Sequence, residues 1–446
     1  MMQQKQSLNF GAKGWVLMVY QFIAFLIFVA FTNWPMNALS DFYGGSQTVS
    51  TIYTVGMVAG VIVQLIMSRS IGKVKSIKGL SVILGVISMV FAFLIMVIPI
   101  GMTTLWQVAF FCECFIVTIW CTFIIGILIG QWFPRRKGTV MGIVTVAFPL
   151  GNALMAPFAQ VVFATMATTH MPNVLGAFLP YLILGVVGLL LGAFVIKDYP
   201  EQVGAYRDND KSMSPEIANA MMAEEIENKK TTVWTFGNTL KVGSFWLITL
   251  PLGFMLLGAI GVMTQTTTII GTYGYGPDTP QFGMIMLLIA VVAIIGSIVL
   301  GILDTKFGTK RAIFISLIAM ILSGIFGLFN NFGFTIAALV FLGIFMGASS
   351  NFTVSAAVQY WRREDFPSVF ARLNPVANVI NATGPMIIAI LLIAGGIVGA
   401  FAFILVLGVI GLILILLFKP IKVKEVDDKY RTKAGKPLDD TLVGRK

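Results

Sequence analysis

Twelve apolar segments, separated by short polar stretches, follow one another along the chain. A helix needs about 20 apolar residues to cross the hydrocarbon core of a bilayer, and each segment is close to that length or longer. The segments lie near residues 14–38, 47–68, 77–99, 104–132, 139–165, 175–196, 243–270, 280–303, 311–329, 333–360, 369–393 and 396–418. The pattern predicts an all-α membrane protein with twelve transmembrane helices.

A polar stretch, 197–241, divides these segments into six plus six. Two motifs recur between the halves. Gln131-Trp132-Phe133 before two arginines corresponds to Gln359-Tyr360-Trp361 before two more, and Asn152-Ala153 corresponds to Asn381-Ala382. Internal repeats of this kind are common in membrane carriers. We therefore expect two pseudo-symmetric six-helix bundles, 1–196 and 242–418.

The two remaining stretches are predicted to be solvated connectors. The linker, 197–241, contains Ser214-Pro215-Glu216, a capping residue followed by proline at the first helical position, which predicts a short surface helix. The tail, 419–446, is rich in Lys and Asp and is interpreted in the same way.

Basic residues predict the orientation of the chain in the membrane. All 30 Lys and Arg fall in the termini, in the loops that follow even-numbered spans, or in the first turn of a span entered from them. Short cytoplasmic loops collect positive charge, so both termini are expected in the cytoplasm, with the chain in the plasma or inner membrane. The net charge of +11 is explained by this topology, and no nucleic-acid partner is expected.

Composition excludes several classes of protein. The chain is 57% hydrophobic and 11% charged, with a mean hydropathy of +0.91, which is too apolar for a soluble domain. Cys112, Cys114 and Cys121 share one apolar helix, so we expect neither a disulfide framework nor a metal site. His170 is the only histidine, and no phosphate loop is present. We expect no enzyme activity and no cofactor, and a channel remains an alternative to a carrier.

Polar residues separate the spans into two groups. The third, sixth, ninth and twelfth spans are almost wholly apolar, as expected for helices that face lipid, whereas the others carry amides and hydroxyls that hydrocarbon would leave unpaired. Either these groups join neighbouring helices, or they face a central cavity; we favour the cavity because amides cluster at similar depths. The candidate solute-binding residues are Gln21, Trp120, Asn152, Gln265, Asn351, Asn378 and Asn381.

Glu113 is the only acidic residue inside an apolar segment of membrane length. A charged side chain at the centre of a spanning helix costs roughly 2.5–3.5 kcal/mol on insertion scales, so such residues usually face a protein interior or a watery cavity. Glu113 is therefore the candidate proton-coupling site, with a structural hydrogen bond to a neighbouring span as the alternative. Trp120 lies seven residues further on, on the same predicted helix face.

The loop between the eighth and ninth spans carries a motif. Gly301, Asp304 and Gly308, followed by Lys310-Arg311, resemble the loop signature of the major facilitator superfamily. This resemblance implies two bundles that rock about a central site, with Asp304 and Arg311 gating against the start of span five. A plain topology loop is the alternative. The first-half copy has Ser68 where the family has aspartate, which weakens a latch in that half.

Two subgroups of this family bear on the substrate. The run from Trp132 to Gly138 resembles the oxalate/formate antiporter group, whose dianions are bound by basic residues in spans eight and eleven. Here span eight has none and span eleven has only Arg372, near its cytoplasmic end, which disfavours dianions. Arg372 and Arg135 are assigned to gating. Span five also lacks the Gly-Pro of drug–proton antiporters.

These patterns lead to one functional expectation. We expect a secondary active carrier, acting as a monomer in the bilayer, for a small or medium organic acid. A monocarboxylate or amphipathic acid is favoured, moved by proton symport or by exchange for a counter-anion. The alternative is proton-coupled efflux of hydrophobic, drug-like compounds.

Overall fold

The computed structural model describes residues 9–67, 74–133, 136–210, 214, 216–217, 220, 232–277, 279–362, 365–436 and 438. All regular structure in these residues is helical. The first half contains α1 (Ala12–Phe28), η1 (Val29–Asn33), α2 (Trp34–Ala38), η2 (Ser40–Phe42), α3 (Ser46–Met67), α4 (Ile77–Val97), α5 (Thr103–Val117), η4 (Thr118–Ile124), α6 (Ile125–Trp132), α7 (Lys137–Val144), α8 (Ala147–Phe163), α9 (Met166–Thr169) and α10 (Val174–Phe194). The described part of the linker contains the short helices η5 (Pro200–Val203) and η6 (Arg207–Asn209) and ends with α12 (Phe236–Leu240), which precedes the second half.

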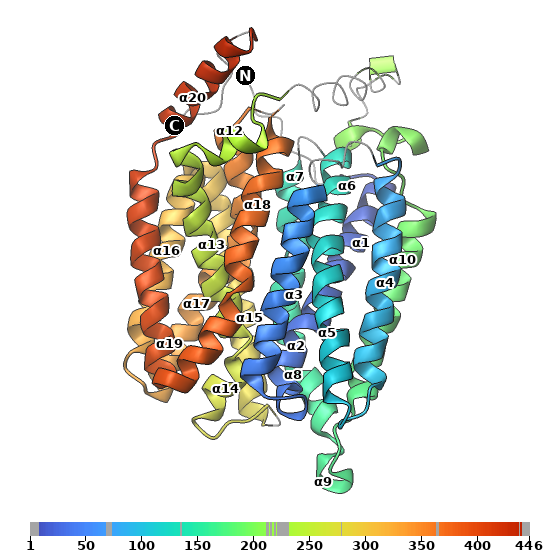
Figure 1. Cartoon of the computed structure of the whole chain (residues 1–446), viewed down its shortest axis with the longest axis vertical. Helices are drawn as coiled ribbons and strands as arrows, with labels where there is room; N and C mark the ends of the chain where they lie inside the picture. Colours follow the sequence, from blue (N-terminus) through green and yellow to red (C-terminus); the bar gives the residue numbers. More distant parts are fainter. Residues whose placement is uncertain are drawn as a thin grey trace.

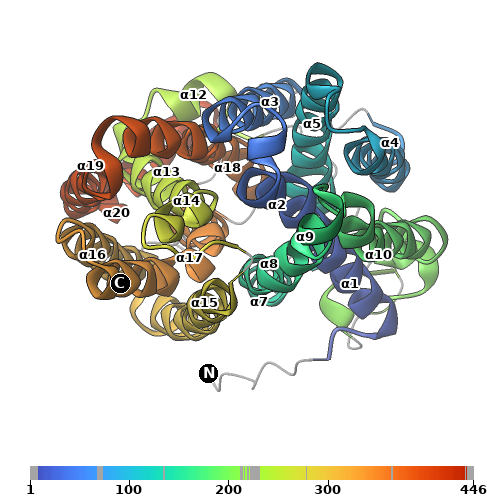
Figure 2. The same cartoon turned by 90° about the horizontal axis from the view of Figure 1, so that it is seen from below.

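The second half contains α13 (Gly243–Met263), α14 (Thr266–Gly271), α15 (Pro280–Phe307), α16 (Thr309–Gly327), α17 (Phe332–Tyr360), α18 (Phe366–Ala382), α19 (Gly384–Leu417) and α20 (Pro420–Lys433). The long helices run roughly parallel to one axis (Figure 1). Seen along this axis, α1–α10 and α12–α20 form two groups side by side (Figure 2). This arrangement agrees with the two bundles expected from the sequence.

The described residues contain eleven apolar segments long enough to cross a membrane. The last of them, Ser368–Leu417, has 50 residues and contains a break at Gly396, where φ is 61° and ψ is −158°. This backbone conformation is open essentially only to glycine, because a Cβ would clash there. Divided at Gly396, the segment gives two spans, so the total of twelve expected from the sequence is confirmed.

The two most apolar spans of the first half, α4 and α10, are also its least buried ones, as their lack of polar residues predicts. Only 28% of the apolar window of α10 and 39% of that of α4 is buried, compared with 78% for the first span, Ala12–Ala38. For α15 the expectation was wrong: this eighth span was grouped with the inward-facing ones but is only 44% buried, less than the 50% of α16, the ninth span, which was expected to face lipid. The peripheral helices therefore present apolar side chains to lipid, while the first span lies in the interior.

Several spans that the sequence predicts as single helices are irregular. The first and fourth spans contain the π-helical segments η1 and η4, and the fifth and seventh are interrupted around Thr145 and Gln265. π-Helical turns leave backbone groups to be bonded in other ways and often occur at functional sites. All four irregularities lie close to the boundary between the two helix groups.

Close helix packing in the second half depends on glycine. A Cβ placed on Gly296 of α15 would lie 2.2 Å from the carbonyl oxygen of Ile344 in α17, and one on Gly347 would lie 2.3 Å from that of Ala293. Small residues allow membrane helices to approach closely and gain dispersion contacts. α15 and α17 therefore meet backbone to backbone.

The tail is not merely a solvated extension. Helix α20 docks on the end of the second helix group through Asp427, which accepts from Arg362 Nε at 2.8 Å, Arg431 Nε at 3.0 Å and Trp234 Nε1 at 2.7 Å. Arg431 also binds Asp365 at 2.7 Å, and all these side chains are buried. Charge alone suggested solvation at 419–446, because the sequence does not show the partners supplied by the linker and the α17–α18 loop. The linker helix predicted from Ser214 lies mostly outside the described residues.

Candidate solute site

A cavity of about 90 Å³ lies between the two helix groups and is lined by both. The molecule has a termini end, at which α1 begins and α20 lies, and an opposite, distal end, which carries α9 and α14 (Figure 1). The cavity volume is below the roughly 300–1,000 Å³ of typical ligand pockets. The cavity as it stands fits a small solute, and a larger one would require the halves to separate.

The polar lining consists of amides and hydroxyls. The amides are Asn33, Asn152, Asn374, Asn378 and Asn381. The hydroxyls are those of Tyr53, Thr118, Thr122, Thr145, Ser349 and Thr353. No charged side chain belongs to the lining formed by the described residues. A site of this kind offers many hydrogen bonds and no counter-charge for an ion.

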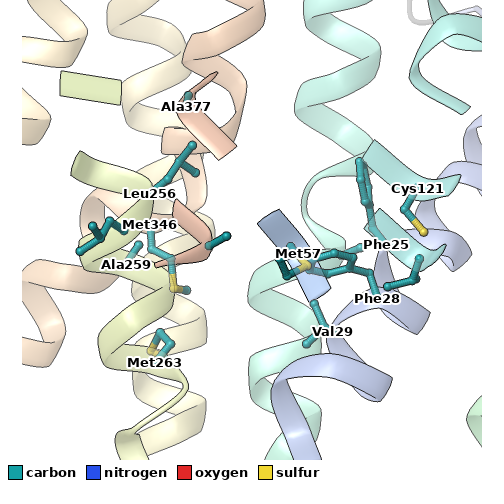
Figure 3. Packing of buried hydrophobic residues seen from close by; sticks show 14 of the residues in the cluster. Phe25, Phe28, Val29, Met57, Cys121, Leu256, Ala259, Met263, Met346 and Ala377 are labelled. Atoms are coloured by element: carbon teal, nitrogen blue, oxygen red, sulfur yellow. The ribbon is translucent and has the colours of Figure 1, made fainter. Parts of the chain in front are cut away.

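Three of the five amides come from one helix. Asn374, Asn378 and Asn381 are spaced by four and three residues in α18, so they project from one helical face. Asn374 Oδ1 accepts from Thr353 Oγ1 of α17 at 3.3 Å. The remaining lining is apolar, and Figure 3 shows Phe25, Phe28 and Met57 of the first half and Leu256 and Met346 of the second on opposite sides. The cavity is therefore amphipathic.

Both π-helical segments border the cavity, and two glutamines bind one of them, η4. Gln21 Nε2 donates to the carbonyl of Cys121 at 3.0 Å, and Gln64 Nε2 donates to that of Thr118 at 3.0 Å. Both carbonyls belong to η4, where π geometry displaces them from the usual helical bonds. Gln21, predicted to bind solute, is thus placed behind the cavity wall.

Glu113 lies inside the first helix group and outside the cavity lining. Its side chain is fully buried, and Oε1 accepts from Ser88 Oγ of α4 at 2.8 Å. This is the neighbouring-span hydrogen bond that the sequence left open as an alternative. Ser88 belongs to a span that was assigned to lipid, but one face of that helix packs inward. Proton coupling by Glu113 stays a prediction.

Trp120 shares this environment. Its Nε1 donates to the hydroxyl of Tyr20 at 3.0 Å, and that hydroxyl lies 2.8 Å from Ser81 Oγ of α4. Trp120 and Glu113 therefore both face α4, as their spacing predicted, but this face points away from the cavity lining. In a span that is mostly buried, as this one is, the polar pattern cannot distinguish the side that faces its own group from the side that faces the other half.

Gln265 closes the distal end. It lies at the break between α13 and α14, where its Oε1 accepts from Ser46 Oγ at 2.7 Å and its Nε2 donates to Ser50 Oγ at 2.8 Å, both from α3. Asn37 of α2 donates to the carbonyl of Met263 at 3.4 Å and accepts from Thr267 Oγ1 at 3.2 Å. These contacts join the two helix groups without a charged residue. We call them the distal closure.

The other predicted solute-binding residues lie at the cavity or beside it. Asn152, Asn378 and Asn381 line it. Asn351 accepts from Thr145 Oγ1 at 2.8 Å, a bond that links α17 to the break between α7 and α8. The structure therefore brings three of the seven candidates into one cavity and places a fourth at its edge.

The predicted gating residues sit at the termini end. Asp304, in the last turn of α15, accepts from Oγ1 of Thr309, the first residue of α16, at 2.6 Å, and Thr309 N donates to Gln359 of α17 at 2.7 Å. Arg311 is exposed, and Arg372 Nη1 donates to the carbonyl of Trp234 at 3.0 Å. Arg135 lies outside the described residues. The motif thus packs on α17 in this conformation, and the gating assignment stays a prediction.

Sequence reasoning missed several lining residues. Asn33 and Tyr53 lie in spans predicted to face inward, but neither was selected, and Thr145 and Thr353 were also overlooked. Asn374, which also lies in a span predicted to face inward, was likewise not assigned to the site. The spacing of Asn374, Asn378 and Asn381 on one helical face was the signal that could have identified all three together.

Comparisons with known proteins agree on the fold. The sequence model of the Major Facilitator Superfamily matches residues 272–442. The structure is similar to that of the major facilitator proton:xylose symporter XylE bound to 6-bromo-6-deoxy-D-glucose, with a TM-score of 0.67 and 14% identity over 91% of this chain and 95% of that chain. At this identity the similarity concerns the fold alone. No curated protein sequence matches the chain.

Proposed function

We propose that the chain is a transporter of the major facilitator superfamily, whose sequence model matches residues 272–442, and that it carries a small or medium monocarboxylic acid together with a proton. The proposed carrier works by alternating access in the cell membrane, with the termini end in the cytoplasm. Exchange of the acid for a second anion is the variant of this proposal in which no proton crosses.

The observation that carries the proposal is the uncharged, amide-rich lining of the cavity. A dianion would need cationic partners, because burying unpaired charge costs several kcal/mol per ion or more, and the described lining offers none. A monocarboxylate that moves with a proton crosses as a neutral unit. Amide N–H groups such as that of Asn378 can hold its polar end, while Phe28 and Met346 contact its apolar part.

The distal closure supports the alternating part of the proposal. Gln265 and Asn37 join the halves through hydrogen bonds between neutral groups, each of which contributes only about 0.5–1.5 kcal/mol net. Such contacts can break and reform during each cycle. A bound solute biases the equilibrium only as far as its affinity differs between the two conformations.

Glu113 is the proposed proton-binding group. It lies on α5, one turn before η4, whose Thr118 and Cys121 line the cavity. Its fully buried position favours the neutral acid over the carboxylate. Loss of that proton would place a charge beside Ser88 and disturb the packing of α5 on α4, and η4 would transmit the change to the cavity.

Uptake into proteoliposomes tests the proposal. Purified protein is reconstituted, and uptake of radiolabelled monocarboxylates of three to eight carbons, a dicarboxylate and a neutral sugar is measured with and without a pH gradient that is acidic outside the vesicles. We expect saturable, gradient-stimulated uptake and counterflow of a monocarboxylate only. Uptake of no acid at all, or uptake that never saturates, would refute the carrier proposed here; the latter would indicate a channel.

A neutral hydroxylated solute is the second candidate. It is favoured by the absence of a charged side chain from the described lining, since amides and hydroxyls are the groups that bind sugar hydroxyls. The structurally similar XylE is a proton:xylose symporter. Saturable sugar counterflow in the same assay would select this candidate, and export of hydrophobic dyes would select the efflux alternative.

A further inference from the structure

Two buried polar atoms at the cavity have no hydrogen-bond partner among the described residues. They are the hydroxyl oxygen of Tyr53, on a residue that is 0% exposed, and Oδ1 of Asn381, on a residue that is 8% exposed. Buried polar groups in proteins are nearly always hydrogen-bonded, and an unsatisfied one carries the cost of its desolvation. Both residues line the cavity, so a bound solute can satisfy them.

The two atoms come from opposite halves but from the same depth. Tyr53 belongs to α3 and Asn381 to α18, and their chain neighbours are bonded directly, since Thr54 Oγ1 donates to the carbonyl of Ala382 at 2.7 Å. This bond fixes α3 against α18 beside the pair. A solute that bridges Tyr53 and Asn381 would therefore contact both halves at once.

We propose that Asn381 and Tyr53 form a subsite that binds an O–H group of the solute, an inference that rests on the proposed function. Oδ1 of an asparagine can only accept, so it pairs with a hydroxyl hydrogen and not with a carboxylate oxygen. The oxygen of the same O–H group can accept from the Tyr53 hydroxyl. The subsite thus requires a donor, which the solute supplies either as an alcohol hydroxyl or as an undissociated carboxyl.

This requirement makes the pair a specificity determinant. Methylation of the solute hydroxyl enlarges the solute only slightly but removes the hydrogen that it donates. The methylated solute therefore leaves Oδ1 of Asn381 unpaired. Sites built to hydrogen-bond a substrate hydroxyl discriminate against analogues that lack it more strongly than apolar pockets discriminate against a methylene. The apolar remainder of the solute would contact the same side chains in either case.

Paired analogues test the subsite. Binding of a 2-hydroxy monocarboxylate and of its methyl ether is measured by thermal stabilisation of purified protein and by counterflow in proteoliposomes. The wild type is expected to favour the hydroxyl compound about 10-fold, and Tyr53→Phe and Asn381→Ala should each weaken its binding about 5- to 10-fold, as expected for one lost hydrogen bond. Binding of the ether should stay unchanged in Asn381→Ala, because the ether has no hydrogen to donate to Oδ1, but should fall in Tyr53→Phe, because the ether oxygen still accepts from the Tyr53 hydroxyl. Tyr273→Phe, which removes a hydroxyl outside the lining, is the control.

A pH series distinguishes the two sources of the donor. If an undissociated carboxyl supplies it, the half-saturating concentration of a simple acid should rise about 10-fold per pH unit above the pKa of that acid. If an alcohol supplies it, the preference for the hydroxyl compound should be independent of pH. Equal binding of the paired analogues by the wild type combined with pH-independent binding of the simple acid, or unchanged binding of the hydroxyl compound in both cavity variants, would overturn the subsite. Absence of counterflow with intact binding would instead overturn the proposed function.

Discussion

Replacing Gln265 by alanine is expected to open the distal end. The side chain of Gln265 makes two hydrogen bonds to α3, at 2.7 Å with Ser46 and at 2.8 Å with Ser50, and these join the two halves. Alanine removes both bonds and leaves the hydroxyl of Ser50, which is fully buried, with one partner fewer. The conformation in which the distal end is closed should therefore lose stability relative to the open one.

The magnitude can be worked out from the number of bonds. Each neutral hydrogen bond contributes about 1 kcal/mol net, so two contribute about 2 kcal/mol. Since 1.4 kcal/mol corresponds to a factor of ten, the ratio of open to closed molecules should rise about 30-fold. A protein that is a few per cent open would become roughly half open, which is a readily measured change.

Distances between spin labels across the distal end measure this change. Labels are attached at Asp41 of η2 and Gln281 of α15, both exposed and from different halves, after Cys112, Cys114 and Cys121 have been replaced. Pulsed electron paramagnetic resonance on protein in nanodiscs should show one dominant distance in the parent and a second, longer population in Gln265→Ala.

Gln47→Ala is the matched control. Gln47 is also a glutamine at the distal end, one residue from Ser46, but its side chain is exposed. Its replacement should leave the distance distribution unchanged. Identical distributions in the parent and in Gln265→Ala would refute the distal closure. If Gln265→Ala instead lowered solute affinity at unchanged distances, Gln265 would be a solute-binding residue, as the sequence predicted.

The remaining predictions concern coupling and stability. Glu113→Gln should abolish pH-driven accumulation in proteoliposomes and keep counterflow, and unchanged accumulation would exclude Glu113 as the coupling site. Asp427→Asn removes the shared partner of two buried arginines and should cost about 3–5 kcal/mol, seen as a lower melting temperature, whereas Asp428→Asn, with a side chain 34% exposed, should have little effect. Gly296→Ala should lower the free energy of unfolding by about 1–3 kcal/mol through its clash with α17. The control is Gly301→Ala in the same helix, where the added Cβ meets nothing within 4 Å. Equal melting temperatures of these two variants would contradict the prediction.

The sequence by itself determined the number of spans and the division into two halves. Both result from local composition, because a bilayer-crossing helix must be apolar along its whole length. Sequence also identified the amides of α18 and Asn152 as inward-facing, since polar groups are costly in lipid. Even the shared face of Glu113 and Trp120 could be predicted from their spacing.

Only the tertiary structure decided what these inward-facing groups meet. Glu113 and Gln21 are bonded within their own helix group, whereas Asn381 and Tyr53 line the cavity between the two halves. Helical periodicity gives the angle between two side chains on one helix, but the rotation of that helix within the bundle depends on the packing of all its neighbours. The π-helical turn at η4 and the glycine contacts of α15 with α17 belong to this packing, and so they determined which polar side chains reach the solute.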